Sequence, residues 1–179
     1  MKKNILLLII CCFLYINAKA QNFNDYFINR TLRVDYIFSG TANQQAVSVQ
    51  DLSQLPSWAG RRYHLAELPL DGNGQITVND SKTGVCIYKT SFSTLFQEWL
   101  DTDEAKTVPR AFENTFLLPY PKQPAVITVS FRDKKGNYNT IMKHEINPSD
   151  ILIKKLENTH ITPYTYLCKS GSPEDCIDV

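Results

Sequence analysis

The chain has 179 residues, enough for one ordinary domain. Hydrophobic residues make up 43% of it and charged residues 21%, a composition that excludes an intrinsically disordered chain. Lys and Arg number 19 against 18 Asp and Glu, so the formal charge is only +1. A nucleic-acid-binding protein needs a basic surface to neutralise phosphates, and this charge balance argues against that class.

Residues 1–20 have the three parts of a secretory signal peptide. Two lysines precede an apolar run at 5–14, and a small-x-small cleavage site ends at Ala20. We expect cleavage near Ala20, leaving an exported protein, periplasmic or extracellular, with 16 basic and 18 acidic residues and a formal charge of −2. A retained anchor and a lipid-modified Cys11 or Cys12 are the less favoured alternatives, because the run is short and both cysteines lie inside it.

Most of the remaining chain alternates apolar and polar residues, which is typical of β-strands with one buried face. The clearest case is 31–39, where Leu32, Val34, Tyr36 and Phe38 alternate with polar residues. Strands are predicted at 31–39, 46–51, 62–68, 75–79, 84–90, 112–118, 125–132 and 138–146.

One stretch changes to helical spacing. Leu95, Phe96, Trp99 and Leu100 recur three and four residues apart, which predicts a short helix capped by Ser93. With many short strands around it, this pattern predicts a mainly β fold, an antiparallel β-sandwich of jelly-roll or Ig-like type with one short helix.

Turn residues separate the predicted strands. Asp71–Gly74 is expected to be a tight turn in which Gly and Asn tolerate positive φ. The three prolines of 119–124 predict a rigid connection outside the sheets, and 133–137 predicts a hairpin. Residues 151–153 are either a last strand or a helical turn.

Removal of the signal peptide leaves three cysteines, Cys86, Cys168 and Cys176. An oxidising compartment permits disulfides. Cys168 and Cys176 flank a turn-rich segment and are a candidate pair, which spacing alone does not decide. Cys86 lies in a strand-like run and is interpreted as a small buried hydrophobic residue.

Motifs that carry chemistry are incomplete in this sequence. His144-Glu145 could begin a zinc-binding helix, but Pro148 stands where the second His is needed. The Asp71–Gln75 segment lacks the Gly and Glu that a calcium loop needs at its sixth and twelfth positions. A nucleophile elbow, a phosphate loop and a dinucleotide fingerprint are also missing from the sequence. We therefore predict no metal, cofactor or catalytic residue, and an enzyme in its own right is the least favoured hypothesis.

Four long segments resemble the N-terminal domain of bacterial IgA-protease-type zinc metallopeptidases: Leu55–Arg61, Leu68–Ile76, Ser91–Leu100 and Phe112–Pro121. The resemblance covers about residues 23–156 and implies a β-sandwich that precedes a zinc peptidase domain. In that family the zinc ligands and the catalytic Glu belong to the following domain, whose His-Glu-x-x-His motif this chain lacks.

The signal-peptide pattern and the resemblance together divide the chain. Residues 1–20 are the signal peptide, 21–156 the sandwich, and 157–179 a linker with the truncated start of a catalytic domain. A truncated gene product, an engineered fragment and a stand-alone paralogue all stay open.

The resulting functional hypothesis is a secreted, non-catalytic accessory domain. It would pack on the zinc peptidase domain, its expected partner, and help to position protein substrate. Aromatic and Arg side chains anchor protein interfaces, so Trp58, Arg61, Trp99 and Tyr120 are the candidate interface residues. A free-standing exported carbohydrate- or protein-binding module is the alternative, and neither hypothesis needs a cofactor, nucleic acid or a membrane span.

Overall fold

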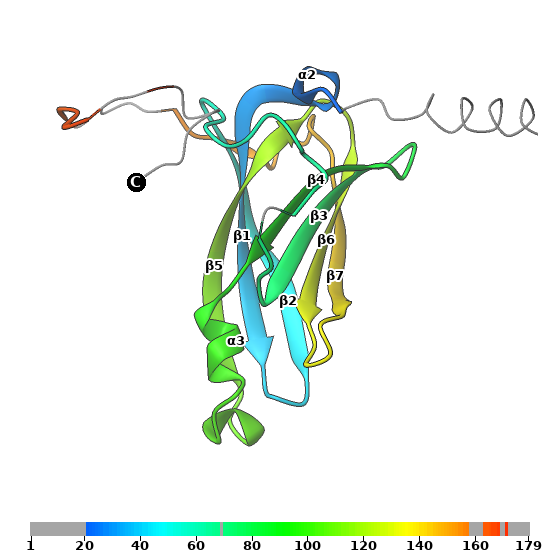
Figure 1. The fold of residues 1–179 in the computed structure, drawn as a ribbon, viewed down its shortest axis with the longest axis vertical. Coiled ribbons are helices and arrows are strands. Elements are labelled where there is room, and N and C mark those ends of the chain that lie inside the picture. The colour runs from blue at the N-terminus through cyan, green and yellow to red at the C-terminus, as the bar shows by residue number, and fades with distance from the viewer. Residues whose placement is uncertain (1–20, 69, 158–162, 169–170, 172–179) are drawn as a thin grey trace, which may run out of the picture.

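The computed structural model of the chain describes residues 21–68, 70–157, 163–168 and 171. Two four-stranded sheets face each other across a hydrophobic core (Figure 1). The first sheet contains, in spatial order, β5 (Arg110–Pro121), β1 (Phe27–Gly40), β2 (Gln45–Leu55) and β8 (Lys154–Lys155). The second contains β4 (Cys86–Phe92), β3 (Gly74–Asp80), β6 (Ala125–Arg132) and β7 (Tyr138–Ile146).

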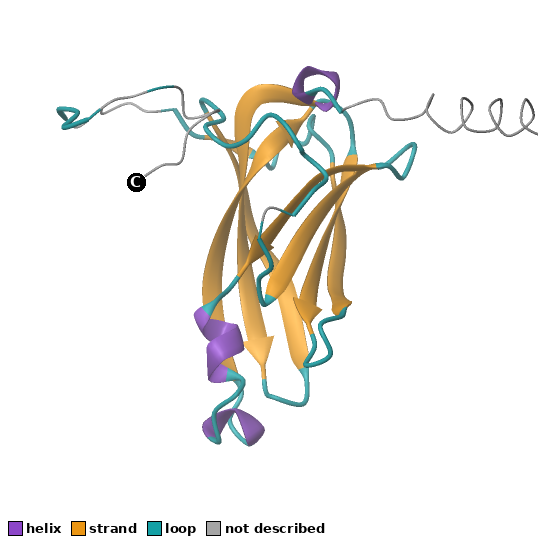
Figure 2. Ribbon diagram, viewed as in Figure 1, coloured by secondary structure: helices purple, strands orange, loops and turns teal. Residues whose placement is uncertain are grey.

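Neighbouring strands are antiparallel, except that β8 pairs in parallel with β2. Helices are short and lie outside the sheets, as Figure 2 shows. In the described residues they are α2 (Phe23–Tyr26), α3 (Leu95–Trp99) and the 3₁₀ turn η1 (Glu104–Lys106). The predicted fold class, a mainly β sandwich, is confirmed, although the described residues contain two short α-helices rather than one.

The core forms where the alternating faces of the two sheets meet. Leu32, Val34, Tyr36 and Phe38 of β1 are buried, as their alternation predicts. Phe38 is the centre of an aromatic cluster, with ring centroids 5.2–6.1 Å from those of its neighbours. These neighbours are Phe92, Phe96, Phe116 and Phe131. Such tilted, edge-on and stacked ring pairs add to the stabilisation from buried apolar area.

One polar pair crosses the core between the sheets. The Tyr36 hydroxyl on β1 lies 2.6 Å from Nε2 of His144 on β7, and the two rings meet edge-on. Burial raises the pKa of Tyr36 and lowers the pKa of His144. Both side chains are therefore uncharged at neutral pH, and their hydrogen bond fixes one sheet relative to the other.

The prediction of a strand at 62–68 is wrong. These residues belong to a long loop, and His64 has φ 51°, a left-handed conformation that no strand residue adopts. One backbone hydrogen bond joins this loop to β4: the Lys89 N–H donates to the Leu65 carbonyl at 2.8 Å. Leu65 is buried, so the apolar residue that suggested a strand is a loop residue whose side chain packs in the core.

The expectation for Asp71–Gly74 is also wrong, because neither of its glycines has a positive φ. Both are needed for close approach instead. A Cβ on Gly72 would lie 2.4 Å from the Phe92 carbonyl oxygen, and a Cβ on Gly74 would lie 2.2 Å from the Phe92 ring. The glycines let the start of β3 pass against the end of β4.

Other boundaries differ less. Pro119 and Pro121 lie inside β5 rather than in a connection, and Thr94 rather than Ser93 precedes α3. Residues 151–153 form a turn that leads into β8. The predicted 125–132 and 138–146 strands and the 133–137 hairpin between them are confirmed in full.

Candidate functional site

The candidate interface residues lie at opposite ends of the sandwich (Figure 1). The exit end consists of α2, the 56–65 loop, the end of β5 and the 147–156 segment after β7. The hairpin end consists of the β1–β2 hairpin, α3 with η1, and the β6–β7 hairpin. Trp58, Arg61 and Tyr120 belong to the exit end and Trp99 to the hairpin end. The fold therefore does not bring the four into one surface.

Trp58 is part of the core at the exit end. Its side chain is 7% exposed, and its ring meets Tyr88 edge-on with centroids 5.9 Å apart. The indole N–H donates to the Arg61 carbonyl, 3.1 Å. Gly60 lies so close that a Cβ there would stand 2.3 Å from the Trp58 ring. Such a buried ring offers little surface to a partner.

Arg61 fastens the loop to β4. Its guanidinium donates to the carbonyls of His64, at 2.9 Å, and of Lys89, and stacks over the Tyr88 ring at 5.1 Å. Burial raises the pKa of Tyr88, and the positive charge of Arg61 partly offsets this. Trp58 and Arg61 thus act within the domain, and their predicted interface role stays a prediction.

Tyr120 lines a hollow of about 390 Å³ at the exit end. Its side chain is 5% exposed and its hydroxyl donates to the Pro148 carbonyl, 3.0 Å. Burial raises the pKa of Tyr120, and the nearby Asp150 carboxylate adds to the rise. Beside it, Ile151 and Leu152 are 95% and 75% exposed, an apolar pair that sequence reasoning missed. Their unbroken apolar run with Ile153 was the available signal.

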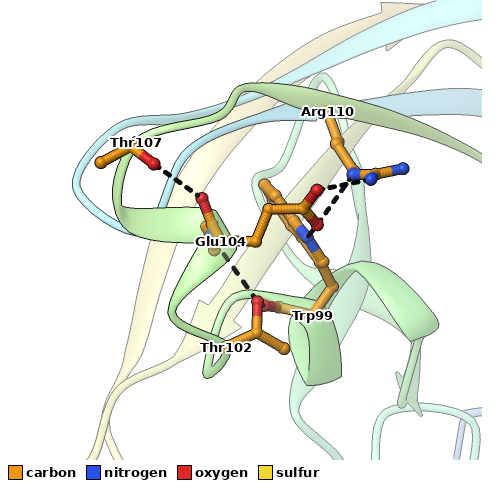
Figure 3. Close-up of polar contacts among 6 residues, drawn as sticks. Trp99, Thr102, Glu104, Thr107 and Arg110 are labelled. Atoms are coloured by element: carbon orange, nitrogen blue, oxygen red, sulfur yellow. Dashed lines mark hydrogen bonds and ion pairs between the residues drawn. The ribbon is translucent and has the colours of Figure 1, made fainter.

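Trp99 belongs to a polar cluster at the hairpin end, which Figure 3 shows. Its indole N–H donates to a Glu104 carboxylate oxygen, 3.0 Å, and Arg110 binds the same carboxylate through two hydrogen bonds of 3.0 and 2.6 Å. Arg110 is the main reason that the pKa of Glu104 is lowered, with Trp99 second. The Trp99 ring packs against Phe96 and Phe112, so the cluster holds α3 and η1 on β5.

A larger hollow, about 830 Å³, opens at the hairpin end next to this cluster. Side-chain amides contribute much of its lining: Asn43, Gln45, Asn73 and Gln97. Its volume lies within the range of small-molecule sites. Sequence reasoning missed it, because its residues come from four separate segments of the chain that only the fold brings together.

Comparison with known protein families places the chain. The model of the peptidase M64 N-terminus matches residues 22–143, more than half of the chain. The chain belongs to the peptidase M64 family. M64 is the family of IgA-peptidase-type zinc metallopeptidases, so the predicted resemblance is confirmed. A search of curated proteins found no match.

The matched part of the M64 chain is the N-terminal domain alone, and its described residues do not fit a zinc site. His144 is committed to Tyr36 in the core, while His64 is exposed and pairs with Glu67 at 3.1 Å. No group of three or more His, Cys, Asp or Glu side chains among the described residues is arranged to hold a metal ion. We derive no catalytic step through zinc in this domain.

Other predictions for this M64 domain fall partly outside the described residues. The signal peptide at 1–20 lies entirely outside them. Cys176 also lies outside them, so the disulfide between Cys168 and Cys176 stays a prediction. Cys168 is exposed, whereas Cys86 is half-buried, and burial raises the pKa of its thiol. In the described part of the chain, every helix is too short or too polar to cross a membrane.

Proposed function

We propose that this chain is the exported, non-catalytic accessory domain of an M64 zinc metallopeptidase, and that it packs on the peptidase domain through its exit end. In this role it holds the peptidase domain in place and helps to position protein substrate. The signal-peptide pattern of 1–20 supports export. The observation that carries the proposal is the exposed apolar pair, Ile151 and Leu152, just after the family match ends at 143.

The chemistry of the exit end favours a protein partner. Exposed aliphatic side chains gain free energy when a partner removes them from water. The hollow beside Tyr120 gives the partner a concave surface to fill, with Lys154 and Lys155 at its border. An apolar centre with a charged rim is the usual anatomy of a protein interface.

Calorimetry tests the proposal. The purified chain is titrated with the separately expressed peptidase domain of a full-length M64 relative, and we expect a Kd in the micromolar range or tighter. The double variant Ile151→Ser, Leu152→Ser should weaken binding at least tenfold. Leu95→Ser is the matched control, because Leu95 is 71% exposed but lies on α3 at the other end.

Two results would contradict the proposal. Absence of binding by the unaltered chain would remove the peptidase domain as partner. An equal loss of affinity in Leu95→Ser and in the double variant would show that the contact does not involve the exit end specifically.

A further inference from the structure

The hollow at the hairpin end has a rigid rim. Asn73, just before β3, is held by its backbone at three points: its N–H donates to Ser93 Oγ at 3.3 Å, and its carbonyl accepts from the Arg132 N–H at 2.8 Å and from the Gln97 amide. The Ala42 N–H donates to the Ala105 carbonyl at 2.8 Å, tying the β1–β2 hairpin to η1. The rim is therefore ordered before any ligand arrives, which lowers the entropy cost of binding.

The amide side chains on this rim are available. Among the described residues, the side-chain amides of Asn43 and Asn73 have no hydrogen-bond partner, and both residues are exposed. Gln45 donates its N–H groups to the Thr41 and Ala42 carbonyls at 3.1 and 2.8 Å, which leaves its amide oxygen free to accept. Each free amide can donate and accept at once.

The charges around the hollow are largely compensated. Lys106 pairs with Asp103 at 2.6 Å, and Arg132 pairs with Asp71 at 3.3 Å. The Asp133 carboxylate accepts from two backbone N–H groups of its own hairpin at 2.8 Å each. Lys134 and Asp101 remain on the rim with opposite signs. A strongly anionic or cationic ligand therefore finds little net charge to attract it.

We propose that this hollow binds a neutral oligosaccharide. Free amides match hydroxyl groups, which also donate and accept, and the half-buried Leu100 side chain in the lining can cover part of the C–H face of a sugar ring. A peptide is less well matched. Extended peptides bind by adding a strand to a sheet edge, and the residues that line this hollow lie near the ends of strands.

Glycan binding at the hairpin-end hollow does not depend on docking of the exit end to the peptidase domain, because the two surfaces lie at opposite ends of the sandwich. The purified chain is applied to an array of neutral oligosaccharides of galactose, mannose and N-acetylglucosamine, with sialylated and uronic-acid glycans and peptides alongside. The strongest neutral ligand is then titrated by calorimetry into variants Asn43→Ala and Asn73→Ala. Asn24→Ala is the matched control, since this exposed amide lies on α2 at the other end.

We expect binding of neutral glycans, a loss of about tenfold or more in each hollow variant, as for about 1.4 kcal/mol of lost hydrogen bonding, and unchanged affinity in Asn24→Ala. The Ile151→Ser, Leu152→Ser variant should bind the glycan normally even if it fails to bind the peptidase domain. Binding of only charged glycans or only peptides, no binding on the array, or wild-type affinity in both hollow variants would overturn the inference.

Discussion

The two ends of the sandwich use the same residue types in opposite ways. At the exit end, Trp58 and Tyr120 are buried, and the aliphatic Ile151 and Leu152 are among the exposed side chains. At the hairpin end, Trp99 reaches a surface ion pair and the rim carries free amides. An apolar surface suits a protein partner, and a rigid polar hollow suits a small hydroxylated ligand. Residue type alone therefore does not identify the interface; its burial and its neighbours do.

The largest expected effect separates the two tryptophans. Trp58→Ala should lower the free energy of unfolding by about 3–5 kcal/mol, because it leaves a cavity in the core beside Tyr88. Trp99→Ala should cost about 1–2 kcal/mol, since its ring is only partly buried. Urea unfolding of both variants measures the difference. A larger loss in Trp99→Ala would mean that the hairpin end, not the exit end, contains the more important ring.

Glycines at the two ends allow a second comparison. Gly60→Ala would force a Cβ against the Trp58 ring, and Gly72→Ala would force one against the Phe92 backbone. Overpacking of this kind costs about 1–3 kcal/mol, and we expect the larger loss for Gly72→Ala because backbone yields less than a side chain. Thermal unfolding of the two variants tests this order. Wild-type stability in Gly72→Ala would contradict the close approach.

The core between the ends should respond to pH through His144. Its pKa is lowered from 6.5 by burial, so near that pH the unfolded chain binds the proton more readily than the folded chain. The contribution of His144 to stability is therefore complete above pH 6.5 and declines as the pH falls below it. Urea midpoints between pH 5 and 8 measure the decline, which Tyr36→Phe should retain and His144→Gln should flatten. A profile that is as steep in His144→Gln as in the wild type would assign the decline to other groups.

The smallest effect is expected at the Trp99–Glu104–Arg110 cluster. Its carboxylate lies at the exposed surface, so Glu104→Gln should change the urea midpoint less than any variant above. The pKa of Glu104 is lowered, so whatever stabilisation the pair provides is present above pH 4.5 and is lost as the pH falls through the lowered value. A midpoint shift as large as that of Trp58→Ala would show that the cluster organises the whole hairpin end.

Local sequence patterns predicted the strands that bury one face. The apolar residues of β1 and β6 alternate because each strand has one side in the core, and the 3.6-residue spacing of α3 has the same origin. Pro119 and Pro121 led to the wrong prediction of a connection, because prolines are excluded only from inner strands and β5 is an edge strand. Gly72 and Gly74 were misinterpreted because Phe92, against which they pack, lies far from them along the chain.

The candidate sites were harder to predict than the fold. Trp58 is buried by the loop around Arg61, and Tyr120 by the turn around Pro148. Tertiary contacts set the positions of this loop and this turn. The hairpin-end hollow needs four separate segments to converge, and no one of them forms the hollow alone. Short-range patterns predict which face of a strand is buried, but not which surfaces lie next to each other.

Hydrogen exchange on the complex with an M64 peptidase domain tests most directly whether the two ends differ in role. Exchange is compared between the free chain and the chain with the peptidase domain in excess. We expect added protection at residues 147–156 and unchanged exchange in the hairpins at 41–44 and 133–137. Protection of the hairpins with no change at 147–156 would contradict the account, because the hairpin end would then be the surface that contacts the enzyme.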